Sequence, residues 1–357
     1  MSTFILATLP QESDDGIPES NEEMLNSMEE NGSLDDTAIP TPSDQRIENS
    51  IEESIAADKV YEEAEQELKE QLEQEAQNMD YGSVNKGVTC VIKRNEPSQK
   101  AYSLYEQDMA EIGNLVQKTV REIKNKIKDY QQGGKMNGLY MGRYLDQHSL
   151  SRYDCRVLCK NDLPEDIPDM AICILIDTSG SMSGEKLSYA RKTALLLYEF
   201  CLKLDIPVMV YGHSNNYEVE LQALADYGSV DGKDRYRICD IYSSGCNRDG
   251  MALRFCSDRL NKRREQNKIM FVISDGLPSA YGSQEEGRKD IRNVLMDYSK
   301  SNVKYITIGL GEDQKRIEDI YTQDMSRNVA AQFLCTDAPS DLPKAIVQTI
   351  KNIIKVK

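Results

Sequence analysis

A loop that follows a buried strand offers oxygen ligands suited to a divalent cation. The apolar run at 171–176 ends on the carboxylate of Asp177, and the hydroxyls of Ser179 and Ser181 follow, separated by a glycine. The run lacks polar alternation, which indicates a strand covered on both faces in the middle of a parallel sheet. Carboxylate and hydroxyl oxygens are hard ligands of the kind that Mg²⁺ prefers. The stretch therefore predicts a cation site at the end of a central strand.

Two further loops can bring oxygens to the same place. The apolar run within 268–276 ends on Asp275, and Asn247 and Asp249 precede a predicted helix start. In open α/β sheets, ligands bind where the carboxyl ends of central strands meet. We therefore predict that Asn247 and Asp275 join the site, with Asp249 as a further candidate.

Each of these stretches also has a purely local interpretation. The Asp and Ser residues of the first loop could cap the helix that follows, because both residue types are favoured there. Asp275 and Gly276 could form an ordinary turn at the end of a strand. His213, which follows a predicted strand, is interpreted as a loop residue rather than a ligand. The combination of three such loops with one fold pattern favours the metal site.

The elements that must position these loops are an alternation of apolar runs and helical patterns from residue 168 onward. Strands are predicted at 171–176, 207–212, 217–221 (a short edge strand), 269–274, 303–309 and 330–335. Helices are predicted at 184–204, 250–264, 288–300, 314–325 and 342–354. This order is typical of βαβ units with right-handed crossovers. The predicted fold class is α/β and Rossmann-like, with a mostly parallel six-stranded sheet.

Three motifs resemble a known family. DTSGSM at 177–182 resembles the Asp-x-Ser-x-Ser signature of the metal-ion-dependent adhesion site in von Willebrand factor A domains. NRDGMAL at 247–253 and ISDGLPS at 273–279 look like the C-terminal domain of the CobT-type subunit of aerobic cobaltochelatase and its bacterial relatives. The lead-in GRYLDQHSLSRYDCRVLCKNDLPE at 142–165 is also similar to theirs. The resemblance covers about residues 138–357, and the six predicted strands match the von Willebrand factor A fold.

The resemblance implies roles for individual residues. Ser179 and Ser181 would bind the ion directly, whereas Asp177 and Asp275 would act directly or through water. The remaining family position, usually threonine, falls on Asn247, whose carbonyl oxygen is also a hard ligand. Charge from the nearby Asp249 would weaken the pull of the ion on a partner's carboxylate. The implied ion is Mg²⁺, with Mn²⁺ as an alternative.

The resemblance also implies partners. These are a ring-forming AAA+ ATPase of the CobS or MoxR type and a client protein that the pair would remodel or metallate. Two serine hydroxyls are neutral, weak ligands, so a carboxylate of the ATPase or client would complete the coordination of the ion. The expected function is a metal-dependent protein-binding adaptor without intrinsic enzyme activity.

Two other functions stay open. One is a passive scaffold whose ion only braces the fold. The other is a Mg²⁺-dependent phosphohydrolase, which is disfavoured because Ser179 stands where haloacid-dehalogenase-type phosphatases have a second aspartate. The serine-hydrolase elbow and the P-loop are also absent.

Composition excludes several classes of protein. The net charge is −17, and residues 1–80 hold 23 Asp and Glu but only 3 Lys and Arg, which argues against nucleic-acid binding. Two histidines exclude a His-rich metal site, and nine cysteines without a regular framework indicate a reducing compartment. Cys155 and Cys159 are interpreted as ordinary thiols. The chain shows no long apolar span and no signal-like start, so we expect a cytoplasmic protein without a membrane segment.

Four segments are predicted along the chain. They are an acidic disordered tail (1–45), a helical acidic region (46–134), a basic lead-in (135–167) and the von Willebrand factor A domain (168–357). Within the second, helices at 46–79 and 101–130 are expected to pair as a hairpin across a linker at 81–100. The lead-in interleaves Lys and Arg with Tyr, which can mean nucleic-acid binding, but a basic collar could equally pair with the acidic helix.

Overall fold

The computed structural model describes residues 42–132, 135–151, 153–161, 169–311, 314–322 and 331–334. The chain divides into two units, residues 1–56 and 57–357. In its described part, the first unit holds only the beginning of a helix, whereas the second holds the sheets and the remaining elements. The predicted tail, apart from residues 42–45, and the predicted helix at 342–354 lie outside the described residues.

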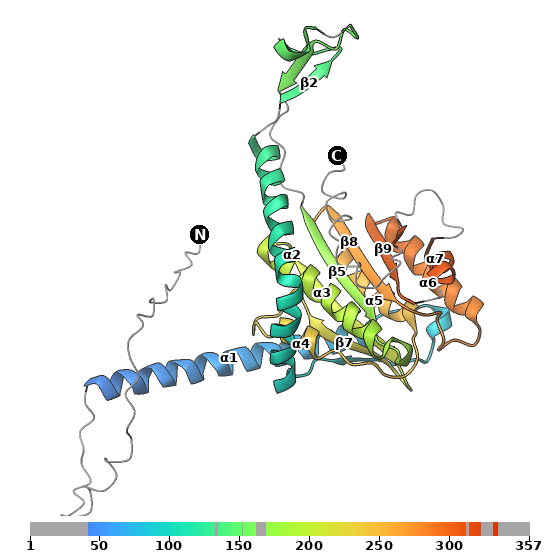
Figure 1. Ribbon diagram of the computed structural model, residues 1–357. Coiled ribbons are helices and arrows are strands. Elements are labelled where there is room, and N and C mark those ends of the chain that lie inside the picture. Colours follow the sequence, from blue (N-terminus) through green and yellow to red (C-terminus); the bar gives the residue numbers. More distant parts are fainter. Residues whose placement is uncertain are drawn as a thin grey trace, which may run out of the picture. The chain divides into compact units, whose positions relative to one another are not determined.

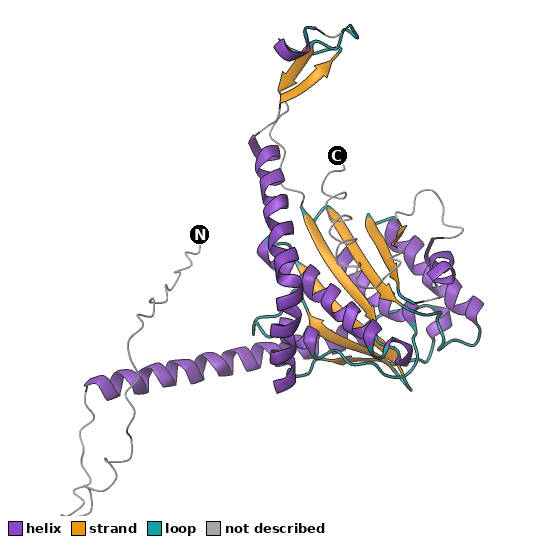
Figure 2. Cartoon of the chain, in the orientation of Figure 1, coloured by secondary structure: helices purple, strands orange, loops and turns teal. Residues whose placement is uncertain are grey.

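A central sheet is the main element of the second unit (Figures 1 and 2). Among the described residues it has seven strands in the order β1-β7-β6-β5-β8-β9-β10. Their bounds are β1 Cys90–Lys93, β5 Met170–Asp177, β6 Val208–Asn215, β7 Val219–Ala225, β8 Asn267–Ser274, β9 Val303–Gly309 and β10 Ala331–Leu334. β6 and β7 form an antiparallel hairpin, and the other neighbouring pairs are parallel. The predicted α/β class with a mostly parallel sheet is confirmed.

The seventh strand, β1, corrects the prediction of six. It lies in the stretch 81–100, so the prediction of a linker there is wrong. β1 pairs with β7 along its whole length, from Cys90 opposite Val219 to Lys93 opposite Gln222. A four-residue strand next to glycine and proline carries no readable periodicity, and its partner is distant in the sequence. For the same reason β7 has a neighbour on both sides and is not the edge strand that the sequence predicts.

Helices cover both faces of this sheet. They are α1 Pro42–Asn78, α2 Gln99–Gln132, α3 Glu185–Lys203, α4 Asp234–Cys239, α5 Asp249–Asn261, α6 Gln284–Ser299 and α7 Gln314–Thr322. Short 3₁₀ helices are η1 Ser83–Asn85, η2 Gln147–Ser149 and η3 Gly180–Met182. Successive side chains of β5 point to opposite faces, so that Ile172 and Ile174 enter one core while Cys173 and Leu175 enter the other.

The two long helices lie on opposite faces of the sheet. Leu68 and Leu72 of α1 belong to the core that also contains α5, α6 and α7. Val116 and Ile123 of α2 belong to the other core, with α3 and α4. The predicted hairpin is therefore wrong. Each helix uses its apolar stripe against the sheet, where more apolar surface is available than on the other helix.

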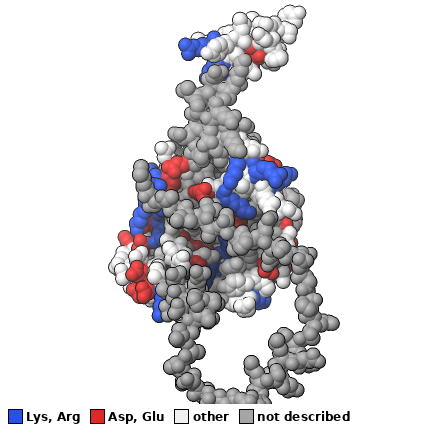
Figure 3. All heavy atoms as spheres, turned by 90° about the vertical axis from the view of Figure 1, so that its left-hand side faces the viewer, with Lys and Arg blue, Asp and Glu red and all other residues white. Residues whose placement is uncertain are grey.

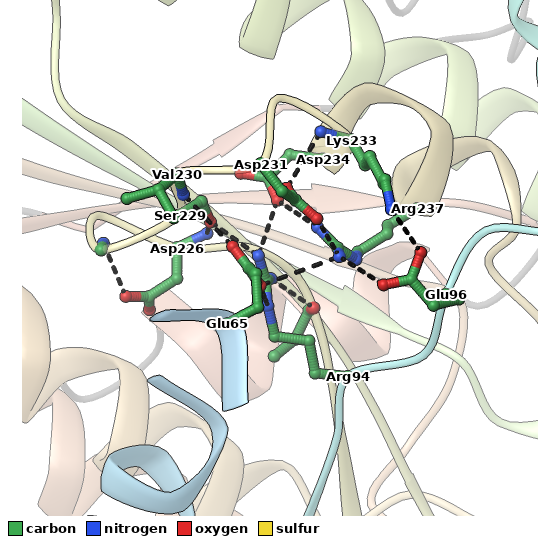
Figure 4. A network of polar contacts seen from close by, with 12 residues as sticks. Glu65, Arg94, Glu96, Asp226, Ser229, Val230, Asp231, Lys233, Asp234 and Arg237 are labelled. Atoms are coloured by element: carbon green, nitrogen blue, oxygen red, sulfur yellow. Dashed lines mark hydrogen bonds and ion pairs between the residues drawn. The ribbon is translucent and has the colours of Figure 1, made fainter. Parts of the chain in front are cut away.

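Buried ion pairs attach α1 to the edge of the sheet (Figure 4). Glu65 accepts a hydrogen bond from Arg94 Nε at 2.6 Å, and Arg94 also pairs with Asp234 at 3.0 Å. Arg237 pairs with the same Asp234 at 3.0 Å and with Asp231 at 2.5 Å. Both arginine side chains are almost fully buried. These contacts fix the helix more specifically than apolar packing alone, because each buried charge has a partner of opposite sign.

A separate small sheet lies within the predicted basic lead-in. Its strands are β2 Lys135–Leu139, β3 Tyr144–Leu145 and β4 Leu158–Asn161, in the antiparallel order β2-β4-β3. Tyr140 is exposed, with the Arg156 guanidinium 4.9 Å from its ring centre. On the face of the molecule in Figure 3, basic and acidic side chains are interspersed. A face of mixed sign is not typical of a phosphate-binding surface.

Candidate metal-binding site

The predicted site residues meet at the carboxyl ends of β5 and β8, which are neighbouring parallel strands. Asp177 is the last residue of β5, and Asp275 directly follows β8. The loop before α5 joins them, because the Gly180 N–H donates a hydrogen bond to the Gly245 carbonyl at 2.9 Å. Three segments that are far apart in the sequence therefore share one edge of the sheet.

Gly245 allows the loop before α5 to pass close to β6. Its φ is +59°, and a Cβ at this position would lie 2.4 Å from the carbonyl oxygen of Asn215. Asn215 and Cys246 exchange two backbone hydrogen bonds of 2.8 Å. A side chain at 245 would break this contact, which places the next residue, Asn247, beside the end of β5.

Asp177 is fully buried and both its oxygens are used. Oδ1 accepts the Ser179 N–H at 2.8 Å. Oδ2 accepts the Ser274 hydroxyl at 3.0 Å and the Asn247 amide at 3.2 Å. The carboxylate thus links all three loops, which suits a residue that acts on an ion through water while holding the ligands in place.

The two serine hydroxyls and Asp275 form a row of oxygens. Ser179 Oγ lies 3.0 Å from Ser181 Oγ, which donates to Asp275 Oδ1 at 2.8 Å. An octahedral Mg²⁺ with bonds of 2.0–2.1 Å places adjacent oxygens about 2.9 Å apart. The spacing and chemistry of these three oxygens therefore fit the edges of a Mg²⁺ coordination sphere.

Asn247 is buried at the same point, with its amide group oriented by Ser279. Asn247 Oδ1 accepts the Ser279 N–H at 2.9 Å and the Ser279 hydroxyl at 2.7 Å. Because a backbone N–H only donates, the oxygen of Asn247 must face Ser279 and its nitrogen must face Asp177. In this arrangement Asn247 orients Asp177 and directs its own oxygen away from that carboxylate.

Asp249 and His213 form a buried pair behind the site. His213 Nε2 lies 3.7 Å from Asp249 Oδ1, and within the described residues no hydrogen bond satisfies either side chain. Burial, reinforced by the charge of Asp177, raises the pKa of Asp249 well above its ordinary value. Burial lowers the pKa of His213 despite the attraction of Asp177. Both shifts favour the uncharged form of the side chain concerned.

The sequence analysis missed the roles of four residues at the site. Ser274 and Ser279 lie within the ISDGLPS motif, and their hydroxyls bind Asp177 and Asn247. Lys186, on the first turn of α3, brings its ammonium 2.5 Å from Asp275 Oδ2. His213, interpreted as a loop residue, instead lies on β6 directly beside Asp177. The two serines belong to a motif that the sequence analysis had singled out, so their roles could have been found. Nothing in the sequence indicates that the lysine side chain points toward Asp275.

Other kinds of metal site have no support in the described part of the chain. There, no group of three or more His, Cys, Asp and Glu side chains could hold a metal ion. Cys155 and Cys159 are free thiols, one exposed and one buried. Among the described helices, none has the length and apolar character that crossing a membrane requires.

Part of this chain is similar in sequence to a known protein. A relative from Bacillus subtilis (strain 168), the uncharacterized protein YojO, is 22% identical over 259 residues. The aligned part is 67% of this chain and 40% of YojO, so the chain spans about two fifths of the length of that relative.

Two solved structures resemble the fold. The PilB minor pilin from Streptococcus sanguinis has a TM-score of 0.45 and 13% identity, over 56% of this chain and 65% of the pilin. The vWF domain of the type V pili tip protein Mfa5 from Porphyromonas gingivalis has a TM-score of 0.42 and 13% identity, over 54% of this chain and 98% of that domain. Nothing about function follows from similarities this distant.

The family model of the von Willebrand factor type A domain matches residues 171–336. This range begins in β5 and includes every loop of the site. Domains of this family often bind a divalent cation through the type of motif found at 177–181. Together with the α/β sheet and the position of the three loops, the match identifies residues 171–336 as a von Willebrand factor type A domain.

Proposed function

We propose that this chain is a Mg²⁺-dependent protein-binding adaptor. Ser179 and Ser181 bind the ion directly, and Asp177 and Asp275 act directly or through water. Mn²⁺ can replace Mg²⁺, since both accept octahedral oxygen ligands. The observation that carries the proposal is the row formed by the two hydroxyls and the Asp275 carboxylate, with spacings of 3.0 and 2.8 Å.

The charge of the donor set indicates what the site binds. Both serines are neutral, and Asp177 is already hydrogen-bonded through both oxygens. Because the serines are uncharged and Asp177 shares its oxygens with hydrogen bonds of the protein, a bound Mg²⁺ keeps coordination positions open to a further charged oxygen ligand. An Asp or Glu side chain of a partner protein is the ligand that best completes such a site.

The partners that fit this proposal are an AAA+ ATPase ring of the CobS or MoxR type and a client protein. Support comes from the motifs NRDGMAL and ISDGLPS, which resemble CobT-type subunits that work with such rings. In these motifs, Asn247 and Ser274 donate hydrogen bonds to Asp177, and Ser279 donates one to Asn247. In this reading, ATP-driven movement of the ring is passed to a client during metal insertion or protein remodelling.

The adaptor proposal is tested in two steps with the full-length chain. Binding of Mn²⁺ is first measured by electron paramagnetic resonance for the wild type and Ser181→Ala, with Ser183→Ala in the same loop as the control. The chain is then used to capture proteins from its native lysate with Mg²⁺ or with chelator. We expect an AAA+ ATPase to be captured only with Mg²⁺ and an intact Ser181. Equal capture under all conditions would contradict the proposal.

A scaffold with a structural ion is the second candidate, and the hydrogen bonds of Asp177 favour it. Because this carboxylate links three loops, Asp177→Ala should lower the free energy of unfolding as well as ion binding. Ser181 links only two of the loops, through its one hydrogen bond to Asp275 Oδ1. If Ser181→Ala abolishes Mn²⁺ binding without affecting partner capture, the ion only braces the fold and the scaffold is correct.

A further inference from the structure

Lys186 is a cation that the protein itself brings to the proposed ion site. It lies on the first turn of α3, and its ammonium is 2.5 Å from Asp275 Oδ2 and 3.4 Å from the carbonyl oxygen of Ser181. Asp275 is one of the proposed ligands, and its side chain is only 1% exposed. The ammonium therefore approaches the same carboxylate that an ion would use.

The surroundings hold the ammonium in place without enclosing it. The end of the Lys186 side chain lies over Gly311, where a Cβ would come within 3.3 Å of both Cε and Nζ. Gly311 has a φ of +87°, so a side chain at this position would also strain the backbone. Yet the Lys186 side chain is 38% exposed, and its flexible stem can turn the ammonium into solvent.

We infer that Lys186 competes with the divalent ion for Asp275 and, once displaced, offers its ammonium to the carboxylate of an incoming partner. This inference rests on the proposed function and adds how the site is controlled. A divalent ion and an ammonium on one buried carboxylate repel each other, so ion binding weakens or breaks the Lys186–Asp275 pair. The displaced ammonium stays near the rim, because its side chain is anchored on α3.

The consequence is coupling between the ion and the partner. Without a partner, the lysine neutralises Asp275 and keeps the affinity for the ion low. A partner's carboxylate can contact both the ion and the displaced ammonium, and therefore stabilises the loaded state over the state closed by the lysine. Each ligand then raises the affinity for the other, as linkage requires.

The test measures Mn²⁺ binding to the full-length chain by electron paramagnetic resonance. Lys186→Met removes the ammonium and should bind Mn²⁺ about fivefold more tightly or better than the wild type. Lys186→Arg keeps the charge and should bind more weakly than Lys186→Met. Lys192→Met is a matched control on the same helix, since Lys192 also lies 2.5 Å from a carboxylate, that of Glu111. It should bind Mn²⁺ like the wild type.

Thermal unfolding gives a second readout with the same proteins. Without metal, Lys186→Met should melt at a lower temperature than the wild type, because Asp275 loses its counter-charge. Mn²⁺ should then raise its melting temperature by more than it raises that of the wild type. Circular dichroism establishes that the variant is folded, and Lys186→Gln repeats the measurement with a polar side chain.

The outcomes separate this inference from the proposed function. If the wild type binds Mn²⁺ and Lys186→Met binds it equally or more weakly, the competition is overturned while the ion site stands. If Lys186→Met binds Mn²⁺ and the wild type does not, the competition is supported in its strongest form. If neither protein binds Mn²⁺, the ion site and the competition both fail.

Discussion

Two groups of buried carboxylates in the described part of the chain are neutralised in different ways. At the edge of the sheet, Glu65, Asp231 and Asp234 are paired with the buried guanidinium groups of Arg94 and Arg237. At the carboxyl ends of β5 and β8, the described carboxylates are instead surrounded by serine hydroxyls and amides, with one partly exposed lysine.

The difference separates a structural cluster from the one proposed to bind an ion. Arginine holds a carboxylate with several rigid hydrogen bonds and keeps its charge when buried, so the first cluster is complete without a ligand. Hydroxyls supply no charge, and a lysine on a flexible stem is easily displaced. The second cluster is therefore able to accept a cation. Changes in the first should affect stability alone, and changes in the second should affect ion binding.

The largest expected effect is on the structural cluster. Arg94→Met removes one of the two guanidinium groups that Glu65 and Asp234 share, with Arg237 remaining at 3.7 and 3.0 Å, and should lower the free energy of unfolding by about 3–5 kcal/mol. Urea unfolding of the full-length chain measures this loss. Mn²⁺ binding of the folded variant should equal that of the wild type, and a change there would remove the distinction between the two clusters.

The next effect is on the ion site. Ser181→Ala removes a proposed direct ligand and should weaken Mn²⁺ binding at least about tenfold. The free energy of unfolding should change by only about 1 kcal/mol, since one hydrogen bond to Asp275 is lost. Titration calorimetry and urea unfolding measure the two quantities. A stability loss as large as that of Arg94→Met would show that the site is mainly structural.

A smaller effect should appear as a dependence of stability on pH. Burial tends to raise the pKa of Glu65, but the hydrogen bond and charge of Arg94 outweigh it and hold this pKa below its ordinary value of 4.5. A depressed pKa in the folded state stabilises the fold above the unfolded pKa, and this contribution is lost as the pH falls through the folded pKa. The free energy of unfolding should therefore decline below about pH 4.5.

Glu65→Gln tests the origin of that decline. The amide does not titrate in this range, so the variant should show a shallower loss of stability on acidification when urea unfolding is repeated at several pH values. An unchanged slope would assign the decline to other carboxylates, such as Asp231, whose pKa is also lowered by Arg237 against the effect of burial.

The smallest effect is expected at the exposed margin of the structural cluster. Lys233 pairs with Glu96 at 2.9 Å, but 41% of the lysine side chain and 68% of the glutamate side chain are exposed. Lys233→Met should change the free energy of unfolding by less than about 1 kcal/mol. A larger change would show that charge, rather than burial, governs the energetics of the cluster.

Much of the domain could be read from local patterns. The strands β5, β8 and β9 are apolar runs of the expected length, and α3 and α5 begin close to their predicted starts. Helix and strand periodicities repeat within a few residues, so a single segment carries them. The approach of Asp177 to Asp275 followed as well, because parallel strands place their carboxyl ends at one edge.

Tertiary structure decided the remainder. The strand β1 exists because β7 offers it an open edge, and α1 and α2 separate because the sheet has two apolar faces to cover. The orientation of Asn247 depends on Ser279, and the position of Lys186 depends on Asp275 and Gly311. The sequence by itself determined which oxygens could meet, since residue type and strand order are local. Only packing between distant segments determined the direction of each polar group, because its partners are brought together by the folded chain.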